Sequence, residues 1–251
     1  MSAAYHKLLS YNKSFTGMTR YSGQSRMLVA VDCIIFGFDG ESLKLLLIKR
    51  GFEPMKNKWS LMGGFVQGNE SFETAATRIL HKLTGLEGVY MEQLFAFGEP
   101  SRDPVERTVS IAYFALIDIN QYKLQLTDEY KAEWVALDQL PDLIIDHSEM
   151  VQMAQEKLRY KAAIHPILFE LLPLKFTIPQ LQLLYEAVYS VTFDKRNFSR
   201  KVLSTGLLIK QKDKDRLSSK RGAFYFKLDK RKYNAKFNAF LNFVTDPGNL
   251  K

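Results

Sequence analysis

The stretch GGFVQGNES (Gly63–Ser71), which leads into FETAATRILHKLTGL (Phe72–Leu86), decides the fold. Glycines at three positions of the first segment predict a loop, because glycine is a frequent breaker of regular structure. Ser71 is typical of helix N-caps, and Gly85 suits the position just after a helix ends. The stretch therefore predicts a loop, an amphipathic helix from Ser71 to Thr84, and a second loop.

The spacing within this stretch resembles the Nudix box, whose pattern is G-x5-E-x7-R-E-U-x-E-E-x-G-U, where U is an aliphatic residue. Most of the matching positions shape the loop–helix–loop. The matching residues are Gly64, Glu70, Arg78, Leu80, Gly85 and Leu86. The resemblance implies a Nudix-type α/β/α sandwich around this motif.

The three helix glutamates of the Nudix pattern are missing, and their positions hold Ile79, Lys82 and Leu83. Glutamates at such spacing project from one helical face and converge on a divalent cation. That cation neutralises a substrate diphosphate and activates water. Ile79 and Leu83 offer no oxygen ligand, and Lys82 brings a positive charge to the cation's place. We therefore expect a scaffold with no catalytic residues, no metal and no cofactor.

The residues around the motif alternate between strand patterns and helix patterns, which is typical of an α+β fold. The region from Gly51 to Asn69 has several Gly and Pro residues and predicts a loop. The predicted strands are Leu28–Phe38, Leu43–Ile48, Leu94–Phe97, Thr108–Ile117 and Trp134–Leu137, and the predicted second helix is Ser148–Lys161.

A second pattern begins near residue 170, where the segments Leu171–Pro173 and Lys175–Pro179 indicate a boundary. Thr177 predicts the cap of a helix that runs to Tyr189, and Asp194 the cap of another, Lys195–Ser204, which stops at Gly206. Two short strands, Leu207–Ile209 and Ala223–Phe226, enclose a basic loop. Helix, turn, basic helix and hairpin form the layout of a winged helix-turn-helix. We thus divide the chain into an arm (1–26), a Nudix-like domain (27–170), a winged helix (171–230) and a tail helix (231–251).

The basic charge of the chain is concentrated in this second part. The whole chain carries a net charge of +8, and residues 194–236 hold 15 Lys or Arg against 4 Asp or Glu. In a winged helix the second helix enters the DNA major groove and the wing contacts phosphate. Phe198 and Val202 should face the core. The residues expected to face DNA are Lys195, Arg196, Asn197, Ser199 and Arg200 on the helix, and Lys212, Lys214, Lys220 and Arg221 on the wing.

A degenerate Nudix domain followed by a winged helix resembles the Nudix-related transcriptional regulators of bacteria. Three more segments look like parts of those regulators: Phe97–Pro104, Arg107–Tyr113 and Asp194–Leu203. The resemblance implies a cytoplasmic homodimer that binds double-stranded operator DNA and responds to a small effector. In one branch of the family the effector is ADP-ribose, and in another it is a sugar. The chain looks closest to the arabinose-responsive type, which implies a repressor of sugar utilisation genes that binds L-arabinose or a related sugar.

A sugar site combines an aromatic face with a few charged groups, and such residues lie in the loops that flank the former catalytic cleft. The candidates are Trp59, Phe97, Glu99, Arg102, Asp103 and Arg107. If the effector is ADP-ribose, Lys49 and Arg50 could contact its diphosphate.

Two other functions stay open. One is a Nudix hydrolase with a rearranged metal site built from Glu70, Glu73 or Glu99, and the other is an RNA-binding or protein-binding C-terminal module. The composition argues against several classes of protein and of binding site. A single cysteine, Cys33, excludes a disulfide scaffold, and the four histidines are too scattered to ligate a metal. The most apolar run, Met27–Phe38, is too short to span a bilayer, so we expect no contact with a membrane.

Overall fold

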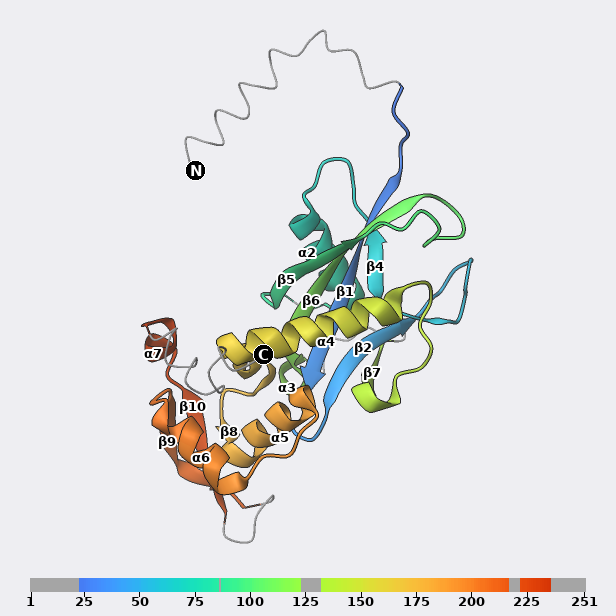
Figure 1. The fold of residues 1–251 in the computed structure, drawn as a ribbon. Helices are drawn as coiled ribbons and strands as arrows, with labels where there is room; N and C mark the ends of the chain where they lie inside the picture. Colours follow the sequence, from blue (N-terminus) through green and yellow to red (C-terminus); the bar gives the residue numbers. More distant parts are fainter. Residues whose placement is uncertain (1–22, 86, 123–131, 217–221, 236–251) are drawn as a thin grey trace, which may run out of the picture.

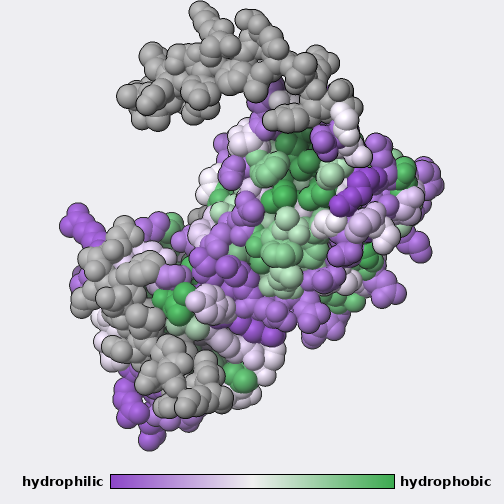
Figure 2. All heavy atoms as spheres, turned by 45° about the horizontal axis from the view of Figure 1, so that its top comes forward, coloured by the Kyte–Doolittle hydropathy of each residue, from purple (hydrophilic) through white to green (hydrophobic). Residues whose placement is uncertain are grey.

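The computed structural model describes residues 23–85, 87–122, 132–216 and 222–235. These residues form a larger, sheet-based part and a smaller C-terminal part, joined through α4 and the segment that follows it (Figure 1). Figure 2 shows hydrophobic residues gathered into a patch on one face of the larger part, with hydrophilic residues around it.

The larger part consists of a mixed sheet with helices on both faces. Its strands are β1 (Leu28–Phe38), β2 (Leu43–Lys49), β3 (Trp59–Ser60), β4 (Met62–Phe65), β5 (Tyr90–Phe97), β6 (Thr108–Asp118) and β7 (Glu133–Ala136). Its helices are α2 (Phe72–Thr84), α3 (Ile119–Tyr122), η2 (Leu137–Gln139), α4 (His147–Ile164) and η3 (Ile167–Leu171).

Strand β1 lies at the centre of this seven-stranded sheet. It pairs in parallel with β6 along its whole length, from Leu28 opposite Thr108 to Phe38 opposite Asp118. On its other edge it pairs with β4 through its first half and with β2 through its second half. The path of the sheet is β3-β2-β1-β6-β5, and β7 adds to β2. Residues Val31 to Phe38 of β1 are buried, because helices pack against both faces of the sheet.

The two faces of β1 enter two different cores because side chains alternate along a strand. Val31, Cys33 and Ile35 pack with the apolar side of α2. Ile34, Phe36 and Phe38 point the opposite way, into the core that α4 and η3 cover. Figure 1 shows α4 crossing in front of the sheet, with α2 on the other side. The predicted α/β/α sandwich is confirmed.

The smaller part has the predicted winged-helix layout. Its elements are β8 (Phe176–Thr177), α5 (Ile178–Tyr189), α6 (Lys195–Ser204), β9 (Leu208–Asp215), β10 (Ala223–Leu228) and α7 (Lys230–Ala235). Thr177 caps α5 through a capping box with Gln180, and the Asp194 side chain accepts the backbone N–H of Asn197 at the start of α6. Phe198 and Val202 are buried, as the sequence predicts.

Several element boundaries differ from the prediction, and four of these cases matter most. The loop predicted from Gly51 to Asn69 contains β3, which pairs with β2, and β4, in which the pairing of Gly63 and Gly64 with β1 overrides the low strand propensity of glycine. Strand β5 starts four residues earlier than expected, at Tyr90. Helix α4 extends the predicted Ser148–Lys161 at both ends. Strand β9 runs to Asp215, so Lys212 and Lys214 lie on a strand and not in a loop, because pairing with β10 continues to Ala223 opposite Asp215.

The predicted boundary near residue 170 falls within η3, whose apolar residues belong to the same core as α5 and α6. The domain limits therefore stay a prediction. Most of the predicted arm and most of the predicted tail helix lie outside the described residues, which include α7 at the start of the tail. None of the described helices is both long and apolar enough to cross a membrane.

Candidate functional site

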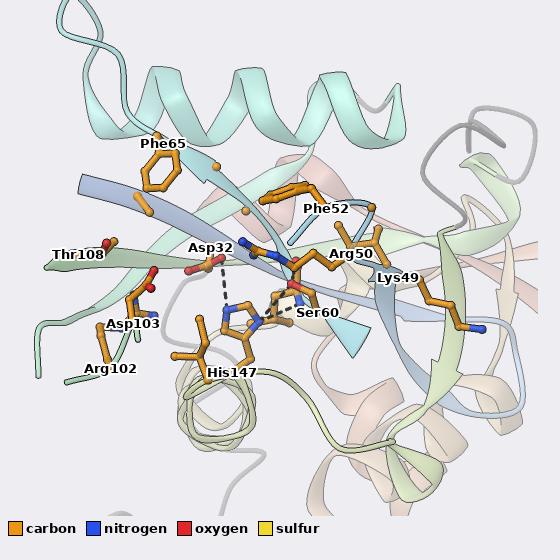
Figure 3. Close-up of a pocket in the computed structure, with 17 residues that line it drawn as sticks. Asp32, Lys49, Arg50, Phe52, Ser60, Phe65, Arg102, Asp103, Thr108 and His147 are labelled. Atoms are coloured by element: carbon orange, nitrogen blue, oxygen red, sulfur yellow. Dashed lines mark hydrogen bonds and ion pairs between the residues drawn. The ribbon is translucent and has the colours of Figure 1, made fainter. Parts of the chain in front are cut away.

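A cavity of about 330 Å³ opens between the central strands and the start of α4 (Figure 3). Strands β1, β2 and β4, the loop after β5 and the segment before α4 each contribute to its wall. The lining residues with polar or aromatic side chains are Asp32, Lys49, Arg50, Phe52, Ser60, Phe65, Arg102, Asp103, Thr108 and His147. Charged groups of both signs therefore meet in one enclosed space.

The Asp32 carboxylate forms the floor of the cavity. It lies on the face of β1 that α4 covers, it is buried, and it accepts a 2.5 Å hydrogen bond from the hydroxyl of Ser110 on β6. Gly63 of β4 pairs with Asp32, and a Cβ at that position would overlap the carboxylate. The glycine of the Nudix-like loop thus leaves room for this buried acid.

His147, the first residue of α4, faces the same carboxylate. Its Nδ1 accepts the backbone N–H of Leu61 at 3.1 Å, so the ring proton of the neutral form lies on Nε2. That Nε2 is 3.7 Å from Oδ1 of Asp32. Burial lowers the pKa of His147 and outweighs the opposing attraction of Asp32 and Asp146. The imidazole is therefore neutral at neutral pH and can donate one hydrogen bond toward Asp32.

A bidentate ion pair fixes the start of α4 on the other side of the cavity. Nε and Nη2 of Arg102 donate to the two carboxylate oxygens of Asp146, both at 2.7 Å. The Arg102 side chain is only 4% exposed. Paired charges of this geometry hold their partners in a defined orientation. The β5–β6 loop is thereby fastened to the residue that precedes α4.

Arg50 and Lys49 are neighbours in sequence but point in different directions (Figure 3). The Arg50 guanidinium lies inside the cavity, 4.1 Å from the ring centroid of Phe52, and its buried Nε has no hydrogen-bond partner within the described ranges. The Lys49 ammonium turns to the ring of Trp59, 4.5 Å away, and to Glu133. Arg50 is thus the cation of the cavity with unused hydrogen-bonding capacity.

Two of the six predicted effector residues, Arg102 and Asp103, line the cavity, and the other four do not. Trp59 packs against the main core and carries Lys49 over its ring. Phe97 is buried, with its ring edge against Phe95.

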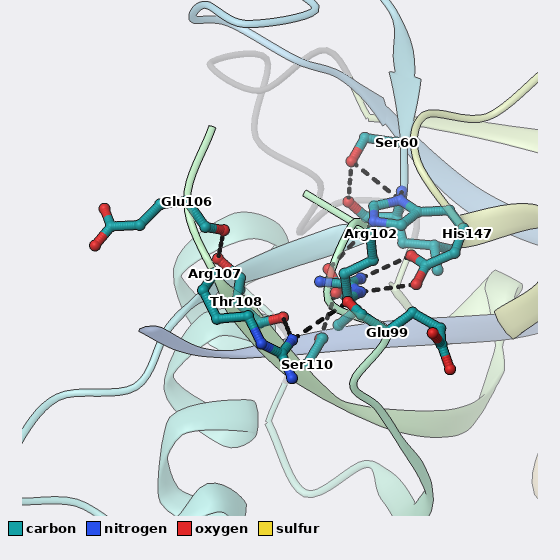
Figure 4. A network of polar contacts seen from close by, with 11 residues as sticks. Ser60, Glu99, Arg102, Glu106, Arg107, Thr108, Ser110 and His147 are labelled. Carbon is teal, nitrogen blue, oxygen red and sulfur yellow. Dashed lines mark hydrogen bonds and ion pairs between the residues drawn. The ribbon is translucent and has the colours of Figure 1, made fainter. Parts of the chain in front are cut away.

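Glu99 and Arg107 shape the loop between β5 and β6 (Figure 4). Arg107 donates to the backbone oxygens of Gly98, Glu99 and Thr108, and the Glu99 carboxylate points away from that network. Arg107 thus holds the loop that carries Arg102 through its side chain, and Glu99 takes part only through its backbone oxygen.

The sequence interpretation did not single out the cavity residues Asp32, Phe52, Ser60, Phe65, Thr108 and His147. One signal could have found Asp32, which is a lone charge within an otherwise apolar strand pattern. No comparable signal marks His147, because it is 115 positions away from Asp32 and only the fold brings the two together. The cavity is therefore mainly a product of the tertiary structure.

Of the three helix positions that carry metal ligands in Nudix enzymes, the side chains of two are described here, and neither offers an oxygen ligand. Ile79 is 3% exposed and lies against Gly64, and Lys82 points to solvent. The side chain of Leu83 lies outside the described residues. Among the residues that the structure describes, no three His, Cys, Asp or Glu side chains lie close enough together to hold a metal ion.

The two charged Nudix-box residues that match the pattern act as a structural pair. Arg78 donates to both oxygens of Glu70 and to the backbone oxygen of Phe65, and Glu70 also accepts the backbone N–H of Gln67. Hydrogen bonds from Arg78 lower the pKa of Glu70 to about 2. Glu70 is thus occupied in holding the loop that precedes α2, which leaves Glu73 and Glu99 as dispersed, exposed carboxylates.

A second candidate site is the basic surface of the winged helix. On α6, Lys195, Arg196, Asn197 and Arg200 are exposed and Ser199 is half-buried, opposite the buried Phe198 and Val202. Nη2 of Arg200 donates to the Asn197 side chain at 3.0 Å. The helix thus presents one basic, polar face to solvent.

The described part of the wing carries three lysines on alternate positions of β9, namely Lys210, Lys212 and Lys214. The pairing of β9 with β10 is irregular between Lys210 and Lys214. Lys210 and Lys214 both lie over the ring of Phe224, at 3.7 and 4.3 Å. Lys210 was not among the predicted residues, and the predicted Lys220 and Arg221 lie outside the described residues.

Helix α4 links the cavity to the winged helix. His147 at its start lines the cavity, and Arg159 near its end donates from Nε to the backbone oxygen of Val188 in α5 at 2.8 Å. The Tyr189 hydroxyl donates back to the backbone oxygen of Arg159 at 2.9 Å. A single helix therefore lines the cavity at one end and is hydrogen-bonded at the other to α5, the first helix of the winged-helix part.

Comparison with known proteins identifies two family matches. The NUDIX domain model matches residues 26–154, and the model of the NrtR DNA-binding winged helix domain matches residues 168–228. A relative from Acinetobacter baylyi, the ADPR responsive transcriptional repressor NtrR, is 31% identical over 238 residues, which cover 93% of this chain and 95% of the relative.

Two solved structures from Shewanella oneidensis are also similar. NrtR complexed with a 27mer DNA has a TM-score of 0.72 and 29% identity, and the match covers 82% of this chain and 95% of that chain. The NUDIX domain of NrtR complexed with ADP ribose has a TM-score of 0.50 and 29% identity, and the match covers 63% of this chain and 99% of that chain.

The packing of Ile79 gives a first prediction. Ile79→Glu, which restores one position of the Nudix pattern, should lower the free energy of unfolding by about 2–5 kcal/mol, because a carboxylate replaces a buried hydrocarbon. Lys82→Glu, a matched change at an exposed position of the same helix, should change it by less than about 0.5 kcal/mol. Chemical denaturation followed by circular dichroism measures both, and equal stabilities would contradict the packing of Ile79.

The neutral imidazole of His147 gives a second prediction. Folding lowers the pKa of this histidine, so its contribution to the free energy of unfolding is fully present above the unfolded pKa of about 6.5. Below that pH the unfolded state takes up the proton more readily than the folded state, and the contribution is lost. The loss should not exceed about 1.4 kcal/mol per pH unit for this one group. His147→Gln should reduce the pH dependence of the free energy of unfolding, which denaturation experiments between pH 7.5 and 5.5 measure.

His165 is the control, because burial also lowers its pKa but it lies outside the cavity. His165→Gln should leave the contribution of His147 in place. The assignment of a neutral His147 fails if His147→Gln shows the same pH dependence as the unmodified protein.

Proposed function

Because the chain belongs to the family of Nudix-related transcriptional regulators represented by NrtR, we propose that it is a repressor whose winged helix binds operator DNA and whose Nudix domain binds ADP-ribose. The effector occupies the cavity around Asp32, Arg50 and Arg102. Binding of the effector lowers the affinity of the winged helix for operator DNA.

The observation that carries this proposal is the double attachment of α4. Its first residue, His147, lines the cavity. Near its other end, Arg159 forms two hydrogen bonds with α5. A displacement at His147 or Asp146 therefore reaches the module that carries α6. Coupling of this kind requires two sites that bias the same structural element.

The charges of the cavity favour ADP-ribose over the predicted arabinose. A diphosphate needs a cation with free donors, and the buried Nε of Arg50 lacks a partner in the described part of the chain. The relatives point the same way, because the Acinetobacter repressor is ADPR responsive and the Shewanella NUDIX domain was solved with ADP ribose. The expectation of a sugar effector gains no such support, and we propose the ADP-ribose alternative in its place.

We further propose that the chain binds its effector without hydrolysing it. Ile79 fills the position of a metal ligand with buried hydrocarbon, and Glu70 is engaged by Arg78. A homodimer on a palindromic operator remains part of the proposal, because one winged helix makes few base contacts and two-fold pairing doubles them.

The third prediction tests this function directly. The affinity of the protein for operator fragments selected from genomic DNA should fall at least fivefold when ADP-ribose is saturating. Typical coupling energies between two sites correspond to 5- to 150-fold changes in affinity. L-arabinose should have no effect, and ADP-ribose should stay intact in the presence of Mg²⁺. Fluorescence anisotropy gives the affinities and chromatography of the nucleotide gives its integrity. Operator affinity that is independent of ADP-ribose would refute the proposal.

The fourth prediction separates base contacts from phosphate contacts. Arg196→Ala or Arg200→Ala should weaken operator binding by about 1–3 kcal/mol per half-site and reduce the preference over scrambled DNA, if that arginine contacts a guanine. Lys210→Ala or Lys212→Ala on the wing should weaken binding to operator and scrambled DNA by the same factor. Each lost phosphate contact should reduce the slope of log affinity against log salt by about 0.9.

Binding isotherms at several salt concentrations measure both effects. Lys82→Ala, an exposed lysine on α2, is the control and should change neither quantity. If the α6 variants kept full operator affinity and preference, the recognition helix would be wrongly assigned.

A further inference from the structure

One aromatic ring in the hairpin of the winged helix carries two ammonium groups. Lys210 and Lys214 of β9 both place their Nζ atoms over the ring of Phe224 on β10, at 3.7 and 4.3 Å from its centroid. A lysine ammonium at such a distance is attracted by the negative face of the ring. The ring therefore holds two positive charges close to one point of the wing.

An irregularity in the strand pairing brings both lysines to this ring. Lys214 lies opposite Phe224, but Lys210 lies opposite Phe226, so β9 has four residue steps where β10 has two. In a regular strand, residues four positions apart are separated by about 13 Å. Extra residues in one strand of a pair bend that strand. The lysines at the two ends of the irregular segment thereby reach the same ring.

The ring and the stem of one lysine are fixed by their surroundings. Phe224 is half-buried and packs against the main hydrophobic core. The stem of Lys214 lies against Gly222, where an added Cβ would come within 3.3 Å of the lysine Cδ. Gly222 has a φ of +71°, a left-handed conformation that favours glycine. The ring is therefore a fixed platform, and the stem of Lys214 runs along a defined backbone toward it.

The two ammonium groups have no acidic partner among the residues that the structure describes. The neighbouring Asp213 pairs with Lys175 at 2.7 Å, and Asp215 is buried. Two like charges near one ring repel each other, and an anion between them removes that repulsion. Each ammonium has three donors, and not all of them can point at the ring. The pair is therefore suited to bind an anionic group such as a backbone phosphate.

We propose that Phe224 is a positioning residue for DNA binding, whose ring holds the ammonium groups of Lys210 and Lys214 together as a clamp on the phosphate backbone. The inference rests on the proposed function, because it names the groups through which the wing binds DNA. The clamp carries no sequence preference, since phosphate contacts position a protein and base contacts specify the sequence. It strengthens binding because two flexible side chains are ordered before they meet DNA.

A double-mutant cycle on the full chain tests the proposal, with fluorescence anisotropy on operator and on scrambled duplex. Phe224→Leu keeps an apolar side chain and removes the π-face. It should weaken binding to both duplexes by the same factor, about two- to fivefold per wing, which corresponds to one exposed cation–π contact. Phe224→Tyr, which keeps the π-face, should bind like the unmodified protein.

Backgrounds without the charges separate positioning from packing. In the double variant Lys210→Met/Lys214→Met, which keeps unbranched stems, Phe224→Leu should cause no further loss of affinity. In the matched background Lys212→Met, it should still cause the full loss, because Lys212 is exposed on the same strand and contacts no ring within the described ranges. Equal losses in the two backgrounds would mean that Phe224 acts only by packing, and would overturn the proposal.

Tyr225→Leu is a second control. Tyr225 is a half-buried aromatic residue of the same strand, and no ammonium of the described chain lies over its ring. Its variant should bind both duplexes like the unmodified protein, and a loss as large as that of Phe224→Leu would also overturn the proposal. If the unmodified chain binds operator DNA and Phe224→Leu binds it equally well, the clamp is wrong and the proposed function stands. If the unmodified chain binds no DNA, both are wrong.

Discussion

The parallel pairing of β1 with β6 along their full length is the constraint on which the rest of the structure depends. Helices cover both faces of this strand pair, so the alternation of side chains along β1 decides which of the two cores each one enters. Odd-numbered residues such as Val31 and Cys33 face α2. Even-numbered residues face α4, which places Asp32 opposite His147. A charge on that face has to be solvated by protein groups, and the cavity is built around it.

The Nudix-like motif holds residues that shape its loop, while Ile79, Lys82 and Leu83 stand at its metal-ligand positions. In this chain Glu70 and Arg78 form a pair that fixes the loop before α2, and Arg78 also holds the backbone of Phe65. Ile79 fills the former ligand position with hydrocarbon packed on Gly64. A loop that positions a substrate in an enzyme thus serves, under the proposed function, to present one wall of an effector site.

One apolar core runs through both parts of the structure, so the two candidate sites are connected by continuous packing. Phe176, Tyr185 and Phe198 of the winged helix share a single apolar cluster with Phe36 and Leu158 of the larger part. Close-packed cores move between discrete arrangements and deform little. The Arg102–Asp146 pair at one end of α4 and the Arg159–Val188 bond at the other thus define the positions where an effector could change the arrangement.

The sequence by itself determined the elements whose signals are local. Ser71, Thr177 and Asp194 cap their helices as predicted, and the spacing of Phe198 and Val202 fixed the buried face of α6. Only the tertiary structure decided the cavity. Asp32, Arg50, Arg102 and His147 come from four separate segments, and no local pattern encodes their distances. Strand pairing likewise made β4 from a glycine-rich stretch, because hydrogen bonds to β1 outweigh the intrinsic preference of glycine for loops.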